Sequence, residues 1–497
     1  MSIIEEHISG EIQHYVPGEN GAPGSWVTYE NGILSDANVI SASCKRQCCE
    51  DGKFTIGGVF AATMQLVCRL PGFTRYQLGN ARIILRSQYA GEMQAVPVGT
   101  FWATKVSRVH DVFTIRGMDA MGWMDVLVPV ITEQRGGGGY FVLNDNPPPA
   151  TQWIPVTVVN ISMSIARQVF DRDGNEQEEY VYTLSGWFHR FFLTIDSILE
   201  SKTGIGGLAE YRLYNDSLNC NIKCGNNYKF TNLWAIKINS ETGEPDVAFF
   251  GLYMSDNVYK SEKPRDILRW IAEAVGGFIT VERDGKFTMR QFCMPELGIA
   301  EINDNDMEMD SLELADYYLF PDWIDCRFQG KQFTIIDDYY DEKSLGFRLR
   351  ITENPISSGF NDASIDASVA YGIYYAFVQY EDVDRIDGEN VLVPSVNQQH
   401  IGLYKAYPVP FRCRVHKAER YELGQTVIFP DHVNTINNYR YGKVEHVPYL
   451  RSVITSIEWT FRGGTVLSCG EGDTRSVMQL SQDGKADAAL RELRNRV

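Results

Sequence analysis

The chain alternates apolar and polar residues with a period of two in several segments, the pattern of β-strands that bury one face. Apolar residues take every second position at 64–70, 81–85 and 453–461, with polar residues such as Gln65 and Arg69 between them. The 26 Tyr and 25 Phe also fit β-rich structure, since aromatic residues favour strands. These runs predict strands that each turn one face to a core.

Glycine-containing dipeptides that favour tight turns separate the runs. They are Asp51-Gly52, Asp173-Gly174, Asp284-Gly285 and Gly463-Gly464. We therefore expect hairpins at these points, including one across Asp171–Glu179.

Helical patterns are fewer. The clearest is Pro264–Val275, where proline can take the first helical position and apolar residues form one stripe. Gly276-Gly277 would end this helix, and 278–292 then reads as a hairpin. Two further helices are expected at Ser364–Tyr380 and Lys485–Arg496.

The length of 497 residues and the positions of chain breakers predict several domains. The glycine run 136–139 begins a loop that ends near the prolines at 147–149. The expected units are a β-rich unit at 1–135, a β-rich insertion at 136–258, a small α+β helix–hairpin unit at 259–320, a second β-rich unit at 321–475 and a C-terminal tail at 476–497.

Composition narrows the class of protein. A hydrophobic fraction of 44% and a charged fraction of 22% are those of a globular chain. The formal net charge of −18 argues against broad binding of nucleic acid or of anionic membranes, both of which need Lys and Arg. No apolar stretch reaches the length of a membrane-spanning helix, and the first ten residues have no features of a secretory signal. We expect no stable membrane insertion.

The ten cysteines are irregularly spaced, and we expect them to be reduced and buried as small hydrophobic residues. The clusters Cys44/Cys48/Cys49 and Cys220/Cys224 each lack the further ligands of a zinc site. No metal residue is assigned.

Motifs for common catalytic sites are absent from the sequence: there is no G-x-S-x-G elbow, phosphate-binding loop or H-E-x-x-H helix. Asp171–Asn175 resembles the start of a calcium loop, but its glycine is misplaced, which favours a hairpin turn. The acidic residues alternating over 304–310 favour a solvated edge. Asp337, Asp338, Asp341 and Glu342 could supply the carboxylate pair of a glycosidase, or equally a protein interface. We assign no catalytic or cofactor-binding residue and expect no cofactor.

Three blocks, taken in order, resemble the tail hub proteins of bacteriophages, the tail-tip or baseplate-hub class. The first runs from Ile33 through Val59 and continues at Val98–Phe101 and Ile115–Asp119. The second joins Arg265–Phe278 to Arg283–Lys286, and the third joins Tyr421–Asp431 to Ser456–Cys469. The order and spacing of the blocks carry the resemblance, which covers about 30–125, 260–292 and 360–470.

The resemblance implies a mainly β fold with α+β parts: two tube-like β-barrel domains flanking a small helix–hairpin domain, plus the β-rich insertion. Three copies would form a ring of six barrels that lines a channel. Such a homotrimer would join the tail tube or distal tail protein to a spike or fibre protein, with the tape measure protein as a further partner. It would lie at the virion tail tip after assembly in the bacterial host cytoplasm. DNA would pass through without specific binding, and acidic charge would suit the channel lining.

Two other functions stay open. A β-rich carbohydrate-active enzyme would use the carboxylates at 337–342. A receptor-binding adhesin would use the 136–258 insertion.

Overall fold

The computed structural model describes residues 5–19, 24–50, 54–55, 57–89, 91–125, 128–135, 138–143, 165–170, 176–181, 192, 195–196, 199–212, 222–224, 228–231, 234–238, 245–247, 260–274, 277–290, 292, 297–315, 317–328, 331–336, 344–354, 408–416, 421–432, 434–438, 443–447 and 450–470. Within them the fold is mainly β. Its helical parts include α2 (Pro264–Ala274), helical residues at 199–203, and the 3₁₀ turns η1 (Ala120–Asp125) and η3 (Asp304–Asp306).

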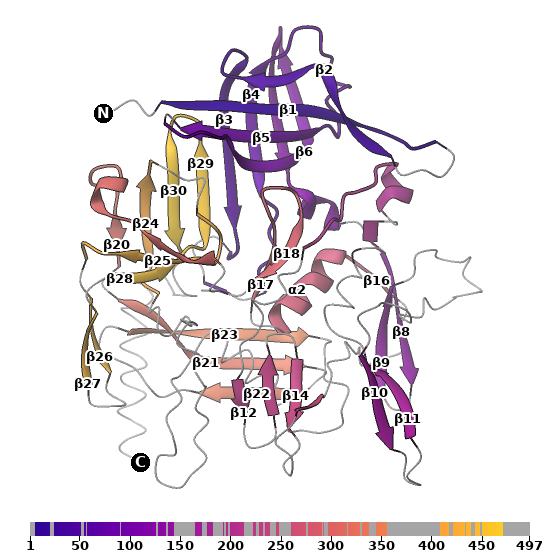
Figure 1. Cartoon of the computed structure of the whole chain (residues 1–497), viewed down its shortest axis with the longest axis vertical. Coiled ribbons are helices and arrows are strands. Elements are labelled where there is room, and N and C mark those ends of the chain that lie inside the picture. Colours follow the sequence, from indigo (N-terminus) through magenta and orange to yellow (C-terminus); the bar gives the residue numbers. More distant parts are fainter. Residues whose placement is uncertain are drawn as a thin grey trace.

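The largest sheet has eleven strands in the order β2-β1-β5-β6-β7-β4-β3-β29-β30-β24-β20 (Figure 1). Its N-terminal strands are β1 (Glu6–Val16), β2 (Ser25–Ser35), β3 (Val39–Gln47), β4 (Thr63–Arg69), β5 (Arg82–Tyr89), β6 (Val96–Val109) and β7 (Val112–Met118). Its other strands are β20 (Glu313–Leu314), β24 (Phe411–Val415), β29 (Ser456–Thr460) and β30 (Gly464–Cys469).

The remaining strands form smaller sheets. Three of them are two-stranded: β17 (Phe278–Val281) with β18 (Phe287–Arg290), β10 (Ile165–Phe170) with β11 (Glu176–Val181), and β26 (Asn434–Asn438) with β27 (Lys443–Val447). Three have three strands, in the orders β19 (Ile299–Glu301)-β25 (Thr426–Phe429)-β28 (Leu450–Val453), β22 (Lys331–Ile336)-β21 (Tyr318–Phe328)-β23 (Ser344–Asn354), and β16 (Lys260–Glu262)-β8 (Val128–Arg135)-β9 (Gly138–Leu143). One has four strands, in the order β12 (Ile222–Cys224)-β13 (Tyr228–Thr231)-β14 (Trp234–Ile238)-β15 (Pro245–Val247).

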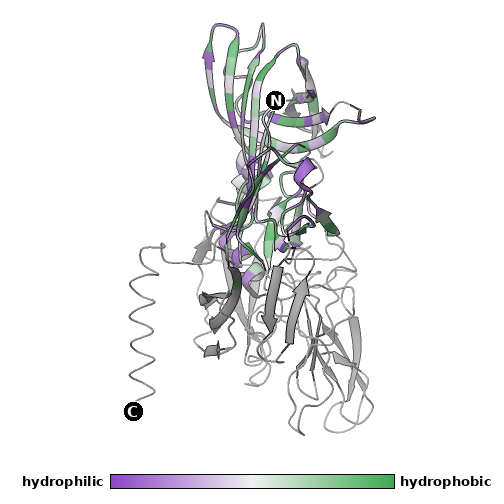
Figure 2. Ribbon diagram, turned by 90° about the vertical axis from the view of Figure 1, so that its left-hand side faces the viewer, coloured by the Kyte–Doolittle hydropathy of each residue, from purple (hydrophilic) through white to green (hydrophobic). Residues whose placement is uncertain are grey.

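One hydrophobic core lies under the N-terminal strands. Leu66 of β4, Ile83 of β5 and Phe113 of β7 are fully buried in it, because alternation along each strand turns them to the same side. Trp459 of β29 joins this core from the other end of the chain. Apolar and polar residues alternate along these strands in Figure 2.

A second core lies between the N-terminal strands and α2. Leu268 of α2 and Phe287 of β18 are fully buried there, together with Leu199 and Leu208. Phe287 also exchanges backbone hydrogen bonds with the 192–212 segment, donating to Glu210 O and accepting from Arg212 N. Part of the expected insertion therefore packs onto the helix–hairpin block.

Several sequence predictions are confirmed. The runs at 64–70 and 81–85 form β4 and β5, and α2 is followed by the β17–β18 hairpin. This hairpin turns at Gly285, whose φ of 93° suits glycine. β10 pairs with β11 as expected of a hairpin across 171–179, and Gly464 begins β30 after the turn from β29. The described acidic residues over 304–310 lie at the surface, mostly exposed, in and after η3.

Other predictions are wrong. The expected closed barrels are open sheets in the described part of the chain, because β3 pairs with β4 on one side and with β29 on the other. The strand expected over 453–461 is split, since the backbone passes at 454–455 from the β25–β28 sheet to the large sheet. Gly138 and Gly139 belong to β9, paired with β8, and not to a loop. The helices expected at 364–380 and 485–496, and the turn at Asp51-Gly52, lie outside the described residues.

Candidate functional site

A cluster of charged side chains lies where the N-terminal strands, the β17–β18 hairpin and the C-terminal strands meet. Its centre is the carboxylate of Glu422, just before β25. Oε1 of Glu422 lies 3.2 Å from Arg283 Nε, and Oε2 lies 3.1 Å from Arg290 Nη1 and 3.4 Å from Arg46 Nη1. Arg46 comes from β3, Arg283 from the hairpin turn and Arg290 from β18. One carboxylate thus holds three arginines from two distant parts of the chain.

A second carboxylate extends this cluster. Glu282, at the end of β17, accepts from Arg290 Nη2 at 2.9 Å and from Arg212 Nη1 at 2.8 Å. Arg212 also contacts Asp284 at 2.7 Å. Positive and negative groups therefore alternate from Arg46 to Asp284. We call Arg46, Arg212, Glu282, Asp284, Arg283, Arg290 and Glu422 the junction cluster.

Glu422 and Arg290, at the centre of the junction cluster, stabilise each other's charged forms. Burial by itself would raise the pKa of Glu422, but Arg46, Arg283 and Arg290 outweigh it and lower this pKa to about 2. Burial would lower the pKa of the Arg290 guanidinium, but Glu422 and Glu282 raise it above its ordinary value. Glu422 and Arg290 therefore stay ionised, which is unsuited to proton transfer and suited to holding the three parts of the chain together.

Further links add backbone groups to the same junction. Arg46 Nη2 donates to Val281 O at 3.0 Å, and Arg290 Nη1 donates to Leu423 O at 3.4 Å. Two backbone hydrogen bonds also join the hairpin to the segment after β3. Gly57 N donates to Gly277 O at 2.7 Å, and Ile279 N donates to Gly58 O at 2.9 Å. The hairpin is therefore bonded to both flanking segments by charge and by backbone.

A second polar link ties the N-terminal strand β1 to the β29–β30 turn. The Glu6 carboxylate is 1% exposed and accepts from Ser87 Oγ at 2.5 Å, Trp459 Nε1 at 2.9 Å and Arg462 N at 2.5 Å. Because a buried carboxylate is costly unless bonded, these three donors specify the position of the turn against β1.

Asp119 plays a local role at the end of β7. Its carboxylate accepts from Ala62 N at 3.0 Å and from Met121 N at 3.1 Å. Burial raises the pKa of Asp119 to about 7, while these bonds and the charges of Arg46 and Arg265 oppose the rise. The residue connects β7, η1 and the approach to β4.

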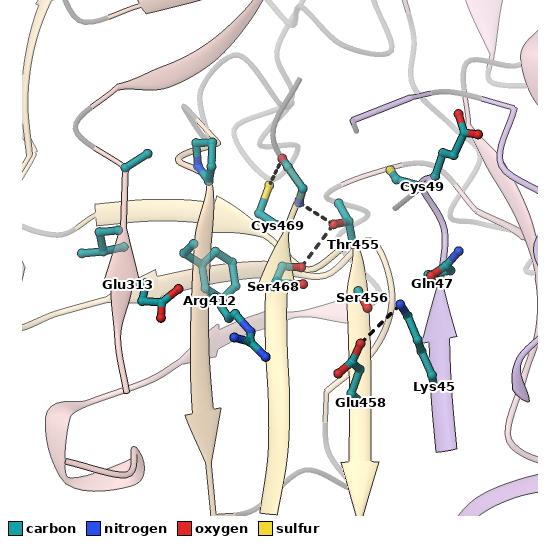
Figure 3. Close-up of a pocket in the computed structure, with 16 residues that line it drawn as sticks. Lys45, Gln47, Cys49, Glu313, Arg412, Thr455, Ser456, Glu458, Ser468 and Cys469 are labelled. Atoms are coloured by element: carbon teal, nitrogen blue, oxygen red, sulfur yellow. Dashed lines mark hydrogen bonds and ion pairs between the residues drawn. The ribbon is translucent and has the colours of Figure 1, made fainter. Parts of the chain in front are cut away.

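A groove of about 470 Å³ lies on the exposed face of the large sheet, over β3, β29, β30, β24 and β20 (Figure 3). Lys45 and Glu458 form an ion pair at 3.3 Å at one side of it. The Thr455 hydroxyl donates to Ser468 O at 3.2 Å, and Gly470 N donates to Thr455 Oγ1 at 2.8 Å. No histidine is among the residues that line this groove, so its serines have no base of that kind beside them.

Six cysteines whose side chains are described are buried free thiols: Cys44, Cys48, Cys49, Cys68, Cys413 and Cys469. Burial raises the pKa of Cys44, Cys68 and Cys413 to about 12, which keeps these thiols protonated. They fill core positions, as the sequence predicted. The predicted cluster of Cys220 and Cys224 lies in a part of the chain whose side chains are not described.

The other chemistry-bearing residues of the sequence are not brought together. Asp337, Asp338, Asp341 and Glu342 lie outside the described residues, as does the turn 171–175. Within the described ranges, no three His, Cys, Asp or Glu side chains are placed to hold a metal ion. No helix in the same ranges is long and apolar enough to cross a membrane.

Sequence reasoning missed the junction cluster. Its members are far apart in the chain and form no motif. One signal was present: Arg46 shares the inward phase of β3 with Ala42 and Cys44, and a charge at a core position requires a partner. Nothing in the sequence could identify Glu422 as that partner.

Comparison with known proteins gives the following. No family model matches the chain, and no curated protein matches it. The solved structures that resemble it include the tail protein from Neisseria meningitidis MC58, with a TM-score of 0.38 at 9% identity, covering 94% of this chain and 97% of that one. They also include the 43 kDa tail protein of prophage MuSo2 from Shewanella oneidensis, with a TM-score of 0.35 at 10% identity, covering 93% of this chain and 96% of that one. Both similar structures are tail proteins.

Proposed function

We propose that this chain is a structural subunit of a phage or phage-like tail, and specifically a hub that forms a trimeric ring at the tail tip. In this role it has no catalytic function. The ring would join the tail tube or distal tail protein to a spike or fibre protein, and it would line the channel.

The observation that carries the proposal is the eleven-stranded sheet. It takes strands from both ends of the chain into one wall, and within the described residues its outermost strands, β2 and β20, each have a single strand partner. An edge strand presents unpaired N–H and C=O groups to another chain. Two different edges on one chain allow head-to-tail contacts, which close into a ring when the rotation per copy is right.

The junction cluster gives independent support. Arg46, Arg283 and Glu422 come one each from the three blocks that resemble tail hub proteins, and they meet at a single carboxylate. A resemblance spread over distant parts of the sequence therefore corresponds to one assembled region of the structure. A rigid junction is what a wall-forming subunit needs, because the two β-rich parts must keep a fixed angle.

The mass of the purified chain tests the proposal. Native mass spectrometry and negative-stain imaging are expected to show three copies of the 56.3 kDa chain in an annulus. A compact monomer at all concentrations would contradict it.

A matched pair of variants tests the role of the sheet edge. Ile33 on edge strand β2 and Ile40 on inner strand β3 are 56% and 55% exposed. Ile33→Lys places a charge on the edge and is expected to shift the ring toward monomers, since edge charges oppose strand pairing. Ile40→Lys adds the same charge away from the edge and is expected to leave the ring intact. Equal effects would refute edge pairing.

A further inference from the structure

The exposed face of the large sheet has an unusual charge pattern. Strands β3, β4, β6 and β7 together contain six Lys or Arg residues and no Asp or Glu. Four of the six lie on this face, namely Lys45, Arg69, Lys105 and Arg116, whereas Arg46 is buried and Arg108 packs over Phe113 on the other face. The whole chain has 64 acidic and 46 basic residues. Acidic residues have therefore been left out of four neighbouring strands of an acidic protein.

Two of these cations face each other without a counter-charge. Lys105 of β6 pairs directly with Arg116 of β7, so their side chains leave the same face about 5 Å apart. Both are exposed, and neither has an acidic partner within the described part of the chain. Like charges directly opposite each other destabilise a sheet. Such a pair gains energy when an anion lies between the two groups.

The pair continues into a row of neutral donors across the sheet. Gln65 of β4 is opposite Arg116, Ser43 of β3 is opposite Gln65, and Thr460 of β29 is opposite Ser43. All five side chains of this row, Lys105, Arg116, Gln65, Ser43 and Thr460, can donate hydrogen bonds, and none is acidic or aromatic. We call it the donor row.

The chemistry of the donor row favours phosphate over a protein partner. Protein interfaces are anchored by buried aromatic and apolar side chains, which the row lacks. Phosphate oxygens accept from Arg, Lys, Ser, Thr and Gln side chains, the types present here. We infer that the donor row is a weak, sequence-independent contact surface for the phosphate backbone of DNA. This inference rests on the proposed function, in which DNA passes along a channel wall.

The net charge of −18 does not prevent the donor row from binding phosphate. Beyond a Debye length of about 10 Å at 0.1 M salt, the remaining acidic surface is largely screened. A phosphate at the β6–β7 end of the row therefore responds mainly to Lys105 and Arg116, whereas Glu458 lies two residues from Thr460 at the other end. The overall charge limits the affinity, which suits a strand that moves past. Strands β3, β4, β6 and β7 lack the acidic residues expected of a channel lining, and the acid nearest to the row is Glu458 of β29, which is paired with Lys45.

Fluorescence anisotropy with a labelled DNA duplex of mixed sequence, over a series of salt concentrations, tests the inference on the full chain. Wild type is expected to bind at about 0.1 M salt, where the acidic remainder is screened, and to lose binding as the salt concentration rises. Lys105→Ser/Arg116→Ser is expected to weaken binding and to reduce the slope of log affinity against log salt by about 1.8, at about 0.9 for each phosphate contact. Arg75→Ser/Arg269→Ser removes equal charge from exposed positions outside the four strands and is expected to keep most of the slope.

A charge reversal separates binding from folding. Arg116→Glu would form a cross-strand ion pair with Lys105, so thermal stability should be kept or raised while DNA binding is lost. Unchanged DNA binding in this variant overturns the inference. Equal loss in the Arg75/Arg269 control also overturns it, because binding would then follow net charge alone.

Polyglutamate distinguishes phosphate from acidic protein. If polyglutamate binds wild type and DNA does not, the row contacts carboxylates and the inference fails. The outcome is separate from that of the proposed function: a trimeric annulus that does not bind DNA overturns only this inference, and a DNA-binding monomer overturns the ring.

Discussion

Replacement of Glu422 by Gln tests the junction cluster most directly. The substitution keeps the shape of the side chain but leaves Arg46 and Arg290, which are 5% and 4% exposed, without their shared carboxylate. Removing one partner of a buried ion pair typically costs about 3–5 kcal/mol. Glu422 itself is 26% exposed, so water can compensate in part and the lower end of that range applies.

The pKa gives a second route to the magnitude. A carboxyl group whose pKa falls from 4.5 to about 2 on folding contributes about 3 kcal/mol of stability at neutral pH. Because the folded-state pKa is depressed, this contribution is complete above pH 4.5 and is lost as the pH falls toward 2. The two routes agree at about 3 kcal/mol.

Denaturant unfolding followed by tryptophan fluorescence measures the effect. Glu422→Gln is expected to lower the free energy of unfolding by about 3 kcal/mol at pH 7 and to have a shallower loss of stability in acid. Glu458→Gln is the control, since it breaks an exposed pair with Lys45 and should cost less than about 1 kcal/mol. If the two variants lose equal stability, or if acid acts alike on Glu422→Gln and wild type, the reasoning is wrong.

Three further predictions concern Glu6, Gly58 and the buried cysteines. Glu6→Ala should destabilise the chain by about 1–3 kcal/mol and speed hydrogen exchange at the β29–β30 turn, because Trp459 Nε1 and Arg462 N lose their acceptor; unchanged exchange there would contradict the link. Gly58→Ala should impair folding, since its Cβ would lie against the carbonyl of Cys48, whereas Gly72→Ala has open space and should cost only backbone strain; soluble yield and melting temperature compare the two. The thiols of Cys44, Cys68 and Cys413 should react with a thiol reagent at pH 8 only after denaturation, because burial raises their pKa to about 12; rapid reaction of the native chain would exclude that packing.

The sequence predicted what depends on local pattern. The alternation of apolar and polar residues at 64–70 predicted β4, and Pro264 at the start and Gly276-Gly277 at the end of an apolar stripe predicted α2. Both signals are local, because strand and helix periods are properties of neighbouring residues. Pairing between distant strands has no such signal. The sequence around Trp459 indicates a buried residue of a strand. Nothing near it indicates that this strand pairs with β3, the pairing that replaces the expected closed barrel by an open sheet.

The candidate site was harder to predict from the sequence than the strand pairing. The residues singled out for chemistry were clustered in sequence, such as 337–342, while the groups that meet in space come from positions 46, 283, 290 and 422. Charge at a core phase, as at Arg46, indicates that a partner exists and not where it is. The cationic face was also hidden by the net charge, because a sum over 497 residues does not show that one set of strands lacks acids.

The pairing of β3 with β29 has a consequence for biosynthesis. Thr460, which lies opposite Ser43, is translated only after more than nine-tenths of the chain has left the peptidyl-transferase centre. At about 5–20 residues per second, the nascent polypeptide waits tens of seconds with that side of β3 unoccupied. That side of β3 is open to non-native pairing in the meantime, so truncations that stop before β29 are expected to aggregate more readily than the full chain.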